Sequence, residues 1–402
     1  MGFGHGAKIV QNGLVMHLDP FNTAKSAKGY DTNLLDLSQW TVGSGSSGTF
    51  NKNGAEEENE RIIDSGPHGK DICVWQSPSN DEGSNSDGGW DTSRFVSDCT
   101  KMHRFTVWTR KKDVMGNGRF YLGTFGFNSF NANIGVRKRA SDTNTTNFYF
   151  HAPRFDNDVS GLIDLEEWVL SVGHAWPAGS GAGAFHSDSG IWNLSGERIY
   201  LGGDTDCIWE HGTEKITHRS YQYYSSTPTE VHQWAMPRVD IVDGTEPSIQ
   251  DLIAGAGAKL YDISGNGNDA WQIGSYTHGK YSDGKFIHAP GDAFFGAPDG
   301  VTTSSLDNGA YWEVETDSSL DPALHNEWTV CGWLNLTGVN SSNGTGWFHK
   351  AGDTDERGIM IEPISRNMRI TDTVSYSELN SGVSAYHNTM AYYSFVCTMS
   401  TG

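Results

Sequence analysis

The sequence predicts an all-β protein made of tandem antiparallel β-sandwiches with very little helix. Its 402 residues include 49 Gly, 14 Trp, 15 Tyr and 18 Phe, and only 19% are charged. Aromatic residues favour strands and glycines favour tight turns. Alternation of apolar and polar residues recurs along the chain, whereas sustained 3.6-residue periodicity is nearly absent. One short helix is expected at residues 248–254, with Ser248 as its N-cap.

A set of three short motifs occurs twice in the same order, which indicates two copies of one architecture. The first two motifs are 70 residues apart in the first set and 67 in the second, and the last two are 63 and 65 residues apart. The first set comprises residues 33–38, 104–108 and 168–173, and the second comprises residues 259–264, 328–333 and 393–398.

Alternating apolar residues place the strands of the first copy. Phe105, Val107 and Thr109 are expected on one face of their strand, with Arg104 and Trp108 on the other. The strands expected in this copy are residues 13–19, 72–75, 104–110, 119–125, 148–150, 168–172, 199–201 and 218–224. In the second copy, residues 264–268 form a turn rich in Gly and Asn.

The pattern divides the chain into an N-terminal arm (1–12), a first sandwich (13–254) and a second sandwich (255–402). Residues 13–19 leave two arrangements open. Either the first sandwich is inserted into the second, or each has its own opening strand, as residues 34–38 favour. The second copy ends nine residues after its last motif strand begins, so we expect the native polypeptide to continue past Gly402.

Charge and cysteine content restrict the partners and the compartment. The formal net charge is −21, which argues against nucleic acid as a partner. The one basic cluster, residues 110–112, is interpreted as a solvated strand end. Five cysteines without metal-type spacing, with Cys331 and Cys397 expected as buried thiols, favour folding in a reducing cytoplasm. No apolar stretch of 18 residues is present, so membrane insertion is not expected.

Two resemblances extend this interpretation. Residues 260–269, 328–333 and 13–19 resemble strands and a turn of concanavalin A-like (laminin G-like) jelly rolls. Residues 87–90, 103–108, 118–123, 218–224 and 237–248 resemble a module of tail fibres and other virion proteins of tailed bacteriophages.

These resemblances imply a structural component of a phage virion, synthesised in the bacterial host cytoplasm and in contact with other virion proteins. The arrangement implied is a homotrimeric tail fibre that attaches to polysaccharide on the host surface. A capsid or collar decoration protein without sugar binding and a polysaccharide depolymerase remain alternatives.

Aromatic and arginine residues supply the candidate glycan site, because aromatic rings cover the C–H faces of sugars. The candidates are Trp90, Arg104, Trp108, Arg219, Tyr221 and Tyr223. Each aromatic residue could instead belong to a sandwich core.

Enzymatic and metal-binding alternatives rest on carboxylates. Glu166 with Glu167, or Glu313 with Glu315, are the candidate glycosidase pairs, although the protein is expected to be non-enzymatic. No other cofactor is expected, and Ca²⁺ is the candidate ion. Its candidate ligands are Asp353 and Asp355, with Asp204 and Asp206 as a second set.

Overall fold

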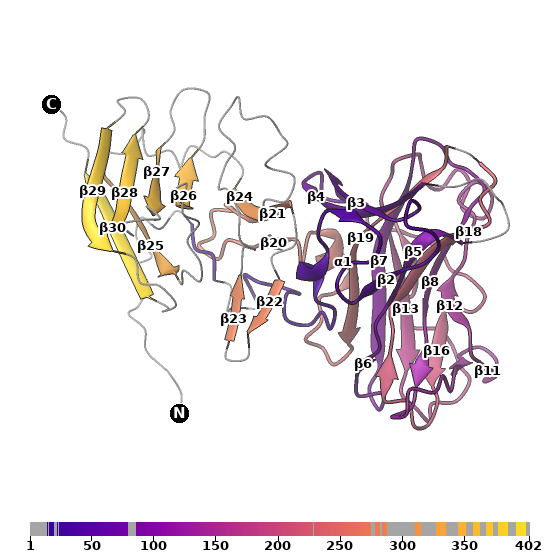
Figure 1. The fold of residues 1–402 in the computed structure, drawn as a ribbon. Coiled ribbons are helices and arrows are strands. Elements are labelled where there is room, and N and C mark those ends of the chain that lie inside the picture. Colours follow the sequence, from indigo (N-terminus) through magenta and orange to yellow (C-terminus); the bar gives the residue numbers. More distant parts are fainter. Residues whose placement is uncertain are drawn as a thin grey trace. The chain divides into compact units, whose positions relative to one another are not determined.

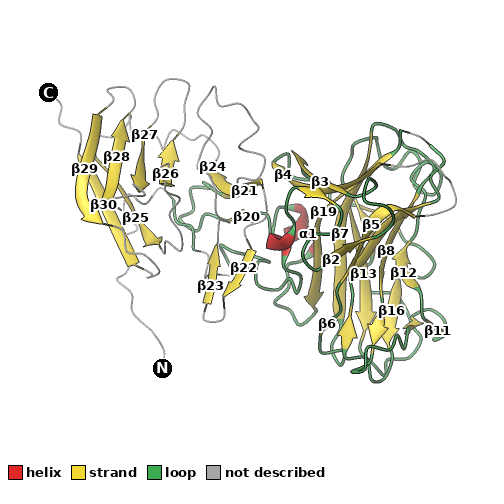
Figure 2. Cartoon of the chain, viewed as in Figure 1, coloured by secondary structure: helices red, strands yellow, loops and turns green. Residues whose placement is uncertain are grey.

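The computed structural model describes most of the chain up to residue 274 and a series of strands beyond it. The described residues are 14, 16–19, 22, 24–78, 86–227, 229–274, 278–281, 284–287, 310–314, 327–334, 345–350, 357–361, 367–372, 377–384 and 391–398. Among them, strands predominate, and the helical elements are a single α-helix, α1 (Ile249–Ile253), and a single 3-10 turn, η1 (Leu37–Gln39) (Figure 2). The all-β prediction is confirmed.

The chain forms two compact units that differ from the expected division. The larger unit comprises residues 20–260 and 274–288, and the smaller comprises residues 1–19, 261–273 and 289–402. The larger unit is therefore inserted into the smaller one in sequence, rather than preceding it. The expected boundaries after residues 12 and 254 do not match this division.

Backbone contacts explain why the N-terminal segment belongs to the smaller unit. The amide of His17 donates to Oδ1 of Asp262 (2.8 Å), and the His17 carbonyl accepts from the amide of Ile263 (2.9 Å). The Asn266 side chain donates to the carbonyl of Leu14 (2.9 Å). Leu14 and His17, from the segment expected to open the first sandwich, thus contact the turn that opens the second. The described residues of this segment form no strand.

One sheet of the larger unit has nine strands in its main path. In spatial order they are β1 (Gly43–Ser44), β3 (Glu60–Ser65), β4 (Asp71–Pro78), β19 (Val231–Ile241), β7 (His103–Lys112), β13 (Val169–Trp176), β16 (Asp206–Trp209), β10 (Val136–Lys138) and β11 (Asn144–Thr145). Strand β14 (Gly190–Trp192) pairs with β13, and β15 (Arg198–Tyr200) pairs with β14. The pairing is antiparallel except between β13 and β16.

A second sheet packs against the first. Its order is β12 (Phe148–His151), β8 (Arg119–Thr124), β18 (Arg219–Tyr223), β5 (Ser86–Thr92) and β2 (Phe50–Lys52), all antiparallel. A small sheet, β6 (Phe95–Val96), β17 (Lys215–Ile216) and β9 (Gly126–Phe127), accompanies it. The two layers of the larger unit can be followed in Figure 1.

Aromatic side chains fill the space between the two sheets. Trp90 on β5 lies 5.7 Å from Trp234 on β19, between ring centroids. Phe105 on β7 lies 5.1 Å from Phe150 on β12. Both pairs are buried and join one sheet to the other, which is the arrangement of a β-sandwich.

The remaining strands begin at residue 259. They are β20 (Lys259–Leu260), β21 (Ala270–Gly274), β22 (His278–Tyr281), β23 (Gly284–Ile287), β24 (Ala310–Val314), β25 (Glu327–Leu334), β26 (Thr345–Lys350), β27 (Arg357–Ile361), β28 (Asn367–Asp372), β29 (Ser377–Ser384) and β30 (Ala391–Thr398). Three of them, β20, β22 and β23, belong to the larger unit. Strands β26 to β29 form a meander, and β25 pairs with β30.

The repeated motifs occupy equivalent strand pairs in the two units. Strands β7 and β13 are antiparallel neighbours in the larger unit, and β25 and β30 are antiparallel neighbours in the smaller. Phe105 lies opposite Gly173, and Trp328 lies opposite Cys397. Counted from the start of each motif, Arg104 pairs with the seventh position of its partner motif (His174) and Trp328 with the fifth (Cys397), so the two registers differ by two residues. The repeat is therefore one of paired motif strands, without an identical register.

Candidate functional site

The outward face of the five-stranded sheet in the larger unit brings several polar aromatic residues together. Arg219, Tyr221 and Tyr223 alternate along β18, so they share one face. Tyr221 lies opposite Tyr121 on β8, and Tyr149 on β12 is opposite Gly123, which also pairs with Arg219. Asp91 on β5 is opposite Arg219. We call the set of Asp91, Tyr121, Tyr149, Arg219, Tyr221 and Tyr223 the tyrosine face.

The rings of the tyrosine face contact one another across the strands. The centroids of Tyr149 and Tyr121 are 4.7 Å apart, and those of Tyr121 and Tyr223 are 5.7 Å apart. Tyr224, which follows β18, lies 5.5 Å from Tyr223 and is 49% exposed. Tyr121, Tyr149 and Tyr223 are half-buried, whereas Tyr221 is buried. Three rings are thus anchored by packing and still reach solvent.

Arg219 fixes the positions of its neighbours. Its Nε donates to Asp91 Oδ1 (2.8 Å) and to the Tyr221 hydroxyl (2.7 Å). Its terminal nitrogens donate to the Tyr149 hydroxyl (3.1 Å) and to Asn147 Oδ1 (3.0 Å). The guanidinium also stacks over the ring of Phe125, with Cζ 3.5 Å from the ring centroid. One planar cation therefore orients two tyrosines and a carboxylate.

Tyr121 and Tyr149 of this face remain uncharged at neutral pH. Burial raises the pKa of Tyr121 to about 12. Burial also raises the pKa of Tyr149, although the nearby Arg219 opposes the change. The phenol hydroxyls can therefore both donate and accept hydrogen bonds, which suits sugar hydroxyls.

A glycine makes room for the Tyr149 ring. A Cβ atom at Gly123 would lie 2.4 Å from the Phe148 carbonyl oxygen and 2.7 Å from Cδ1 of Tyr149. Any side chain at this position would push the Tyr149 ring away from Arg219. The sequence motif 118–123 therefore contains a glycine that the site geometry requires.

Two predicted glycan-binding residues lie in the core of the larger unit instead. Trp90 is fully buried and packs against Trp40, Trp75 and Trp234. Trp108 is 2% exposed and lies against His68. The prediction that these rings contact a sugar is corrected, because neither ring has a face open to a ligand. Trp90 packs between the two sheets, whereas Trp108 lies on the opposite face of β7, where His68 covers it.

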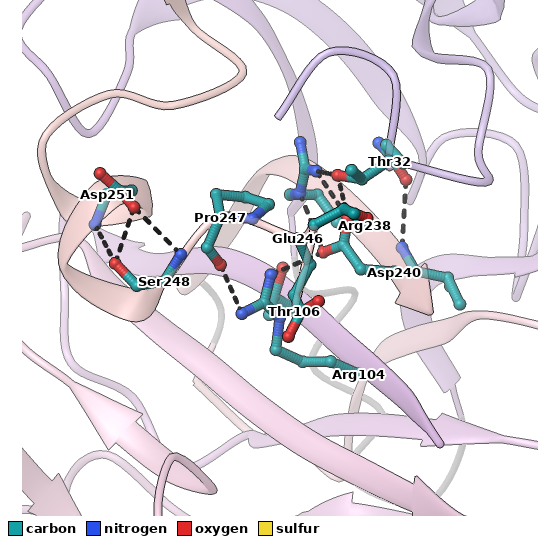
Figure 3. Close-up of polar contacts among 12 residues, drawn as sticks. Thr32, Arg104, Thr106, Arg238, Asp240, Glu246, Pro247, Ser248 and Asp251 are labelled. Carbon is teal, nitrogen blue, oxygen red and sulfur yellow. Dashed lines mark hydrogen bonds and ion pairs between the residues drawn. The ribbon is translucent and has the colours of Figure 1, made fainter. Parts of the chain in front are cut away.

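Arg104, a third predicted residue, belongs to a buried ionic network (Figure 3). Its Nη2 donates to Asp240 Oδ2 (2.9 Å), and its Nη1 donates to the Pro247 carbonyl (2.6 Å). Arg238 and Thr32 donate to Oδ1 of the same aspartate, at 2.7 and 2.8 Å. Burial opposes ionisation of Asp240, but the charges of Arg238 and Arg104 lower its pKa to about 2. Arg104 thus binds the segment that contains Pro247 to the sheet. Its side chain is buried and cannot contact a glycan.

Arg110 and Lys111 of the basic cluster 110–112 are also buried rather than solvated, whereas the Lys112 side chain is 29% exposed. Lys111 is 1% exposed and forms an ion pair with Glu230. Arg110 pairs with Asp64 (3.3 Å) and covers the ring of Trp168. The prediction of a solvated strand end is therefore wrong. Each of these two cations forms an ion pair with a carboxylate from a segment distant in the sequence.

The carboxylates proposed for catalysis or Ca²⁺ are placed only in part. Glu166 is exposed and Glu167 is half-buried, and the Glu167 side chain accepts a hydrogen bond from the Asp164 amide (2.9 Å). Asp206 accepts from Trp176 Nε1 (3.0 Å), and Asp204 pairs with Lys138. The remaining candidates lie outside the residues whose side chains are described: Glu313, Glu315, Asp353 and Asp355.

Within the described part of the chain, no group of three or more His, Cys, Asp or Glu side chains is arranged to hold a metal ion. Cys73, Cys99 and Cys207 are buried free thiols, and the side chains of Cys331 and Cys397 are not described. No helix of the described residues has the length and apolar character needed to cross a bilayer.

The residues missed by sequence reasoning are Asp91, Tyr121 and Tyr149. The sequence does contain a pattern that points to Tyr149. Phe148 and Phe150 flank it, and alternation along a strand places the residue between two core residues on the outward face. The same argument applies to Tyr121 between Phe120 and Leu122. The partnership of Asp91 with Arg219 depends on strand register, which the sequence alone did not provide.

Comparisons with known proteins give no family. No family model matches the chain, and no curated protein matches it. Solved structures that it resembles include a xylan-binding domain from Paenibacillus barcinonensis, at 8% identity and a TM-score of 0.28, over 56% of this chain and 99% of that one. Another is the binding domain of botulinum neurotoxin serotype D/C, at 10% identity and a TM-score of 0.25, over 83% and 74% of the two chains. TM-scores this low do not establish a common fold.

Proposed function

We propose that this protein binds carbohydrate through the tyrosine face, as a host-attachment component of a tailed-phage virion. The observation that carries the proposal is the set of half-buried rings of Tyr121, Tyr149 and Tyr223 on one outward sheet face. Arg219 holds Tyr149 and Asp91 in fixed positions before any ligand arrives. Preorganised aromatic rings beside a few polar groups are typical of sugar sites.

Binding rather than hydrolysis is the activity that this face supports. Asp91 is its one carboxylate among the side chains that the structure describes, whereas most glycosidases need two carboxyl groups flanking the bond. Phenols and amides around Asp91 can orient sugar hydroxyls without cleaving a linkage. A non-enzymatic attachment protein is therefore the proposal.

The virion assignment rests on the sequence resemblance to tail-fibre modules. A homotrimer would present three tyrosine faces, so weak sugar sites would gain avidity. Gold-labelled antibody against the protein, applied to intact phage particles and imaged by electron microscopy, tests the location. Label on the fibres is expected, and label confined to the capsid or collar would favour the decoration alternative.

Glycan binding is tested with an array of bacterial surface glycans probed with the labelled protein. Binding to at least one glycan is expected, and Tyr149→Ala should abolish the signal. Phe130→Ala is the matched control, because Phe130 is an exposed aromatic residue (89%) outside the tyrosine face. An array with no bound glycan would contradict the proposal.

A further inference from the structure

We propose that the ligand of the tyrosine face is an extended, uncharged polysaccharide chain that crosses strands β12, β8 and β18. This inference rests on the proposed carbohydrate binding and adds the class of ligand. It follows from two independent features of the face, the row formed by its rings and the distribution of its charges.

The first feature is a continuous row of four rings. Tyr149, Tyr121, Tyr223 and Tyr224 follow one another with centroid separations of 4.7, 5.7 and 5.5 Å. Each step is close to the length of one pyranose in an extended chain. A single terminal sugar could contact one or two of these rings, whereas successive sugars of a chain could contact all four.

Amide groups lie beside two rings of the row. Asn147 accepts a hydrogen bond from Arg219 beside Tyr149 and is itself exposed. Asn53 donates to the Tyr223 hydroxyl (3.1 Å) and is half-buried. Both amides retain hydrogen-bonding capacity for the hydroxyls of sugars bound at these rings.

The second feature is that each described cation on or beside the tyrosine face is paired with a carboxylate. Arg219 is paired with Asp91, and the side-chain exposure is 7% for the arginine and 39% for the aspartate. The neighbouring Arg119, opposite Tyr223, is 40% exposed and lies 3.8 Å from the carboxylate of Asp158, which is 34% exposed. The group of the central pair that faces solvent is thus the carboxylate. A carboxylate accepts hydrogen bonds from sugar hydroxyls and repels uronate or sulfate groups.

The net charge of the whole chain also disfavours anionic ligands. A formal charge of −21 adds long-range repulsion against anionic polymers. Tyr121 at the centre of the row stays neutral, because burial keeps its pKa far above neutrality. Hydroxyl-rich, uncharged chains therefore fit the face better than acidic capsules.

Affinity electrophoresis of the full chain tests the inference with matched polymers. Native gels would contain hydroxyethyl cellulose, galactomannan or arabinoxylan as neutral chains, and carboxymethyl cellulose, alginate or polygalacturonate as anionic chains. We expect retardation by at least one neutral polymer and by no anionic polymer. Tyr121→Ala and Tyr223→Ala should each weaken retardation by about tenfold or less, and the double variant by more.

The control and the contradicting results separate this inference from the proposed function. Phe130→Ala should be retarded like the wild-type protein. Preference for an anionic polymer, or retardation that the tyrosine variants leave unchanged, would overturn the inference. Binding to short glycans on the array with no polymer retarded would also overturn it, while leaving carbohydrate binding intact. A protein that binds nothing in either assay would contradict both.

Discussion

Arg219 donates from Nε to Oδ1 of Asp91 at 2.8 Å, across the neighbouring strands β18 and β5. The same guanidinium donates to the Tyr149 hydroxyl from the other side (3.1 Å). The carboxylate and the ring are therefore linked through one cation, although they belong to strands that are not adjacent in the sheet. A substitution at Asp91 should therefore alter the position of Tyr149 through Arg219.

Asp91→Ala is expected to weaken glycan binding more than it weakens the fold. Asp91 is 39% exposed, so solvent screens the pair and its loss should cost about 1 kcal/mol of unfolding free energy. Urea denaturation measures that cost, and calorimetric titration with an array-selected glycan measures affinity. A fully folded variant with unchanged affinity would argue against a role for this carboxylate in the site.

Gly123→Ala should displace the Tyr149 ring. The added Cβ would lie 2.4 Å from the Phe148 carbonyl oxygen, so strand β12 must shift, at a cost of about 1–3 kcal/mol. Gly203→Ala is the control, because a Cβ there meets no atom within 4 Å. Thermal unfolding of the two variants should differ clearly, and equal melting temperatures would contradict the described packing.

Asp240→Ala should destabilise the larger unit strongly. It would leave Arg104 and Arg238 as buried cations without their shared carboxylate, which costs about 3–5 kcal/mol. Asp156→Ala is the matched control, because Asp156 pairs with Arg154 near the surface and should cost less than about 1 kcal/mol. Denaturant midpoints compare the two, and a mild effect at Asp240 would show that the network in Figure 3 is dispensable.

Arg104 and Arg219 differ in burial and in partners, and this difference shows which part of the candidate site the sequence alone can predict. Both arginines lie in alternating strands beside aromatic residues, so pattern alone gave them the same expected role. The sequence placed Arg219, Tyr221 and Tyr223 in one candidate site, and strand β18 carries all three on one face. The sequence could not show that residues 245–257 and 30–34 would cover the face that carries Arg104, because that cover comes from distant segments.

Local patterns predicted the secondary structure, whereas the order of the two units along the chain depends on contacts between distant segments. The expected strands other than residues 13–19, the short helix and the repeated motif pairs followed from local periodicity and capping, which the sequence displays directly. The insertion of one unit into the other depends on Leu14 and His17 meeting the turn at Asp262, a contact spanning about 245 residues. No local pattern encodes such a pairing.

Acid should destabilise the protein between about pH 6.5 and pH 4. Burial lowers the pKa of four histidines from the ordinary 6.5 to about 4: His68, His103, His151 and His218. Below pH 6.5 the unfolded chain binds protons that the folded chain does not, so the unfolding free energy falls as pH falls. Each histidine contributes up to about 1.4 kcal/mol per pH unit in this window. Asp240 does not contribute there, because its pKa changes from 3.8 to about 2 on folding.

His151→Phe isolates one of these groups. The variant loses the buried hydrogen bond between His151 Nε2 and the Val172 carbonyl (2.7 Å), so it should be less stable by about 1–3 kcal/mol near neutrality. Its melting temperature should nevertheless decline less steeply between pH 6.5 and pH 4. His211→Phe, at an exposed position, should show the wild-type decline. A melting temperature independent of pH across this window would contradict the burial of the histidines.

Asp262→Ala should loosen the N-terminal segment. The Asp262 carboxylate accepts from the His17 amide (2.8 Å) and from the amides of Ser264 (2.9 Å) and Asn268 (3.0 Å). Limited proteolysis should cleave residues 14–19 faster in the variant, while the larger unit keeps its resistance. Equal cleavage rates would indicate that the segment is not held by this turn.

The central claim is that Tyr121 and Tyr149 form a carbohydrate-binding surface. Its most direct test is calorimetric titration of an array-selected glycan into the wild-type protein and the Tyr121→Ala, Tyr149→Ala double variant. The account predicts affinity reduced by about tenfold or more in the variant, with circular dichroism still showing the folded β-sandwich. Equal affinity in a folded double variant would contradict it.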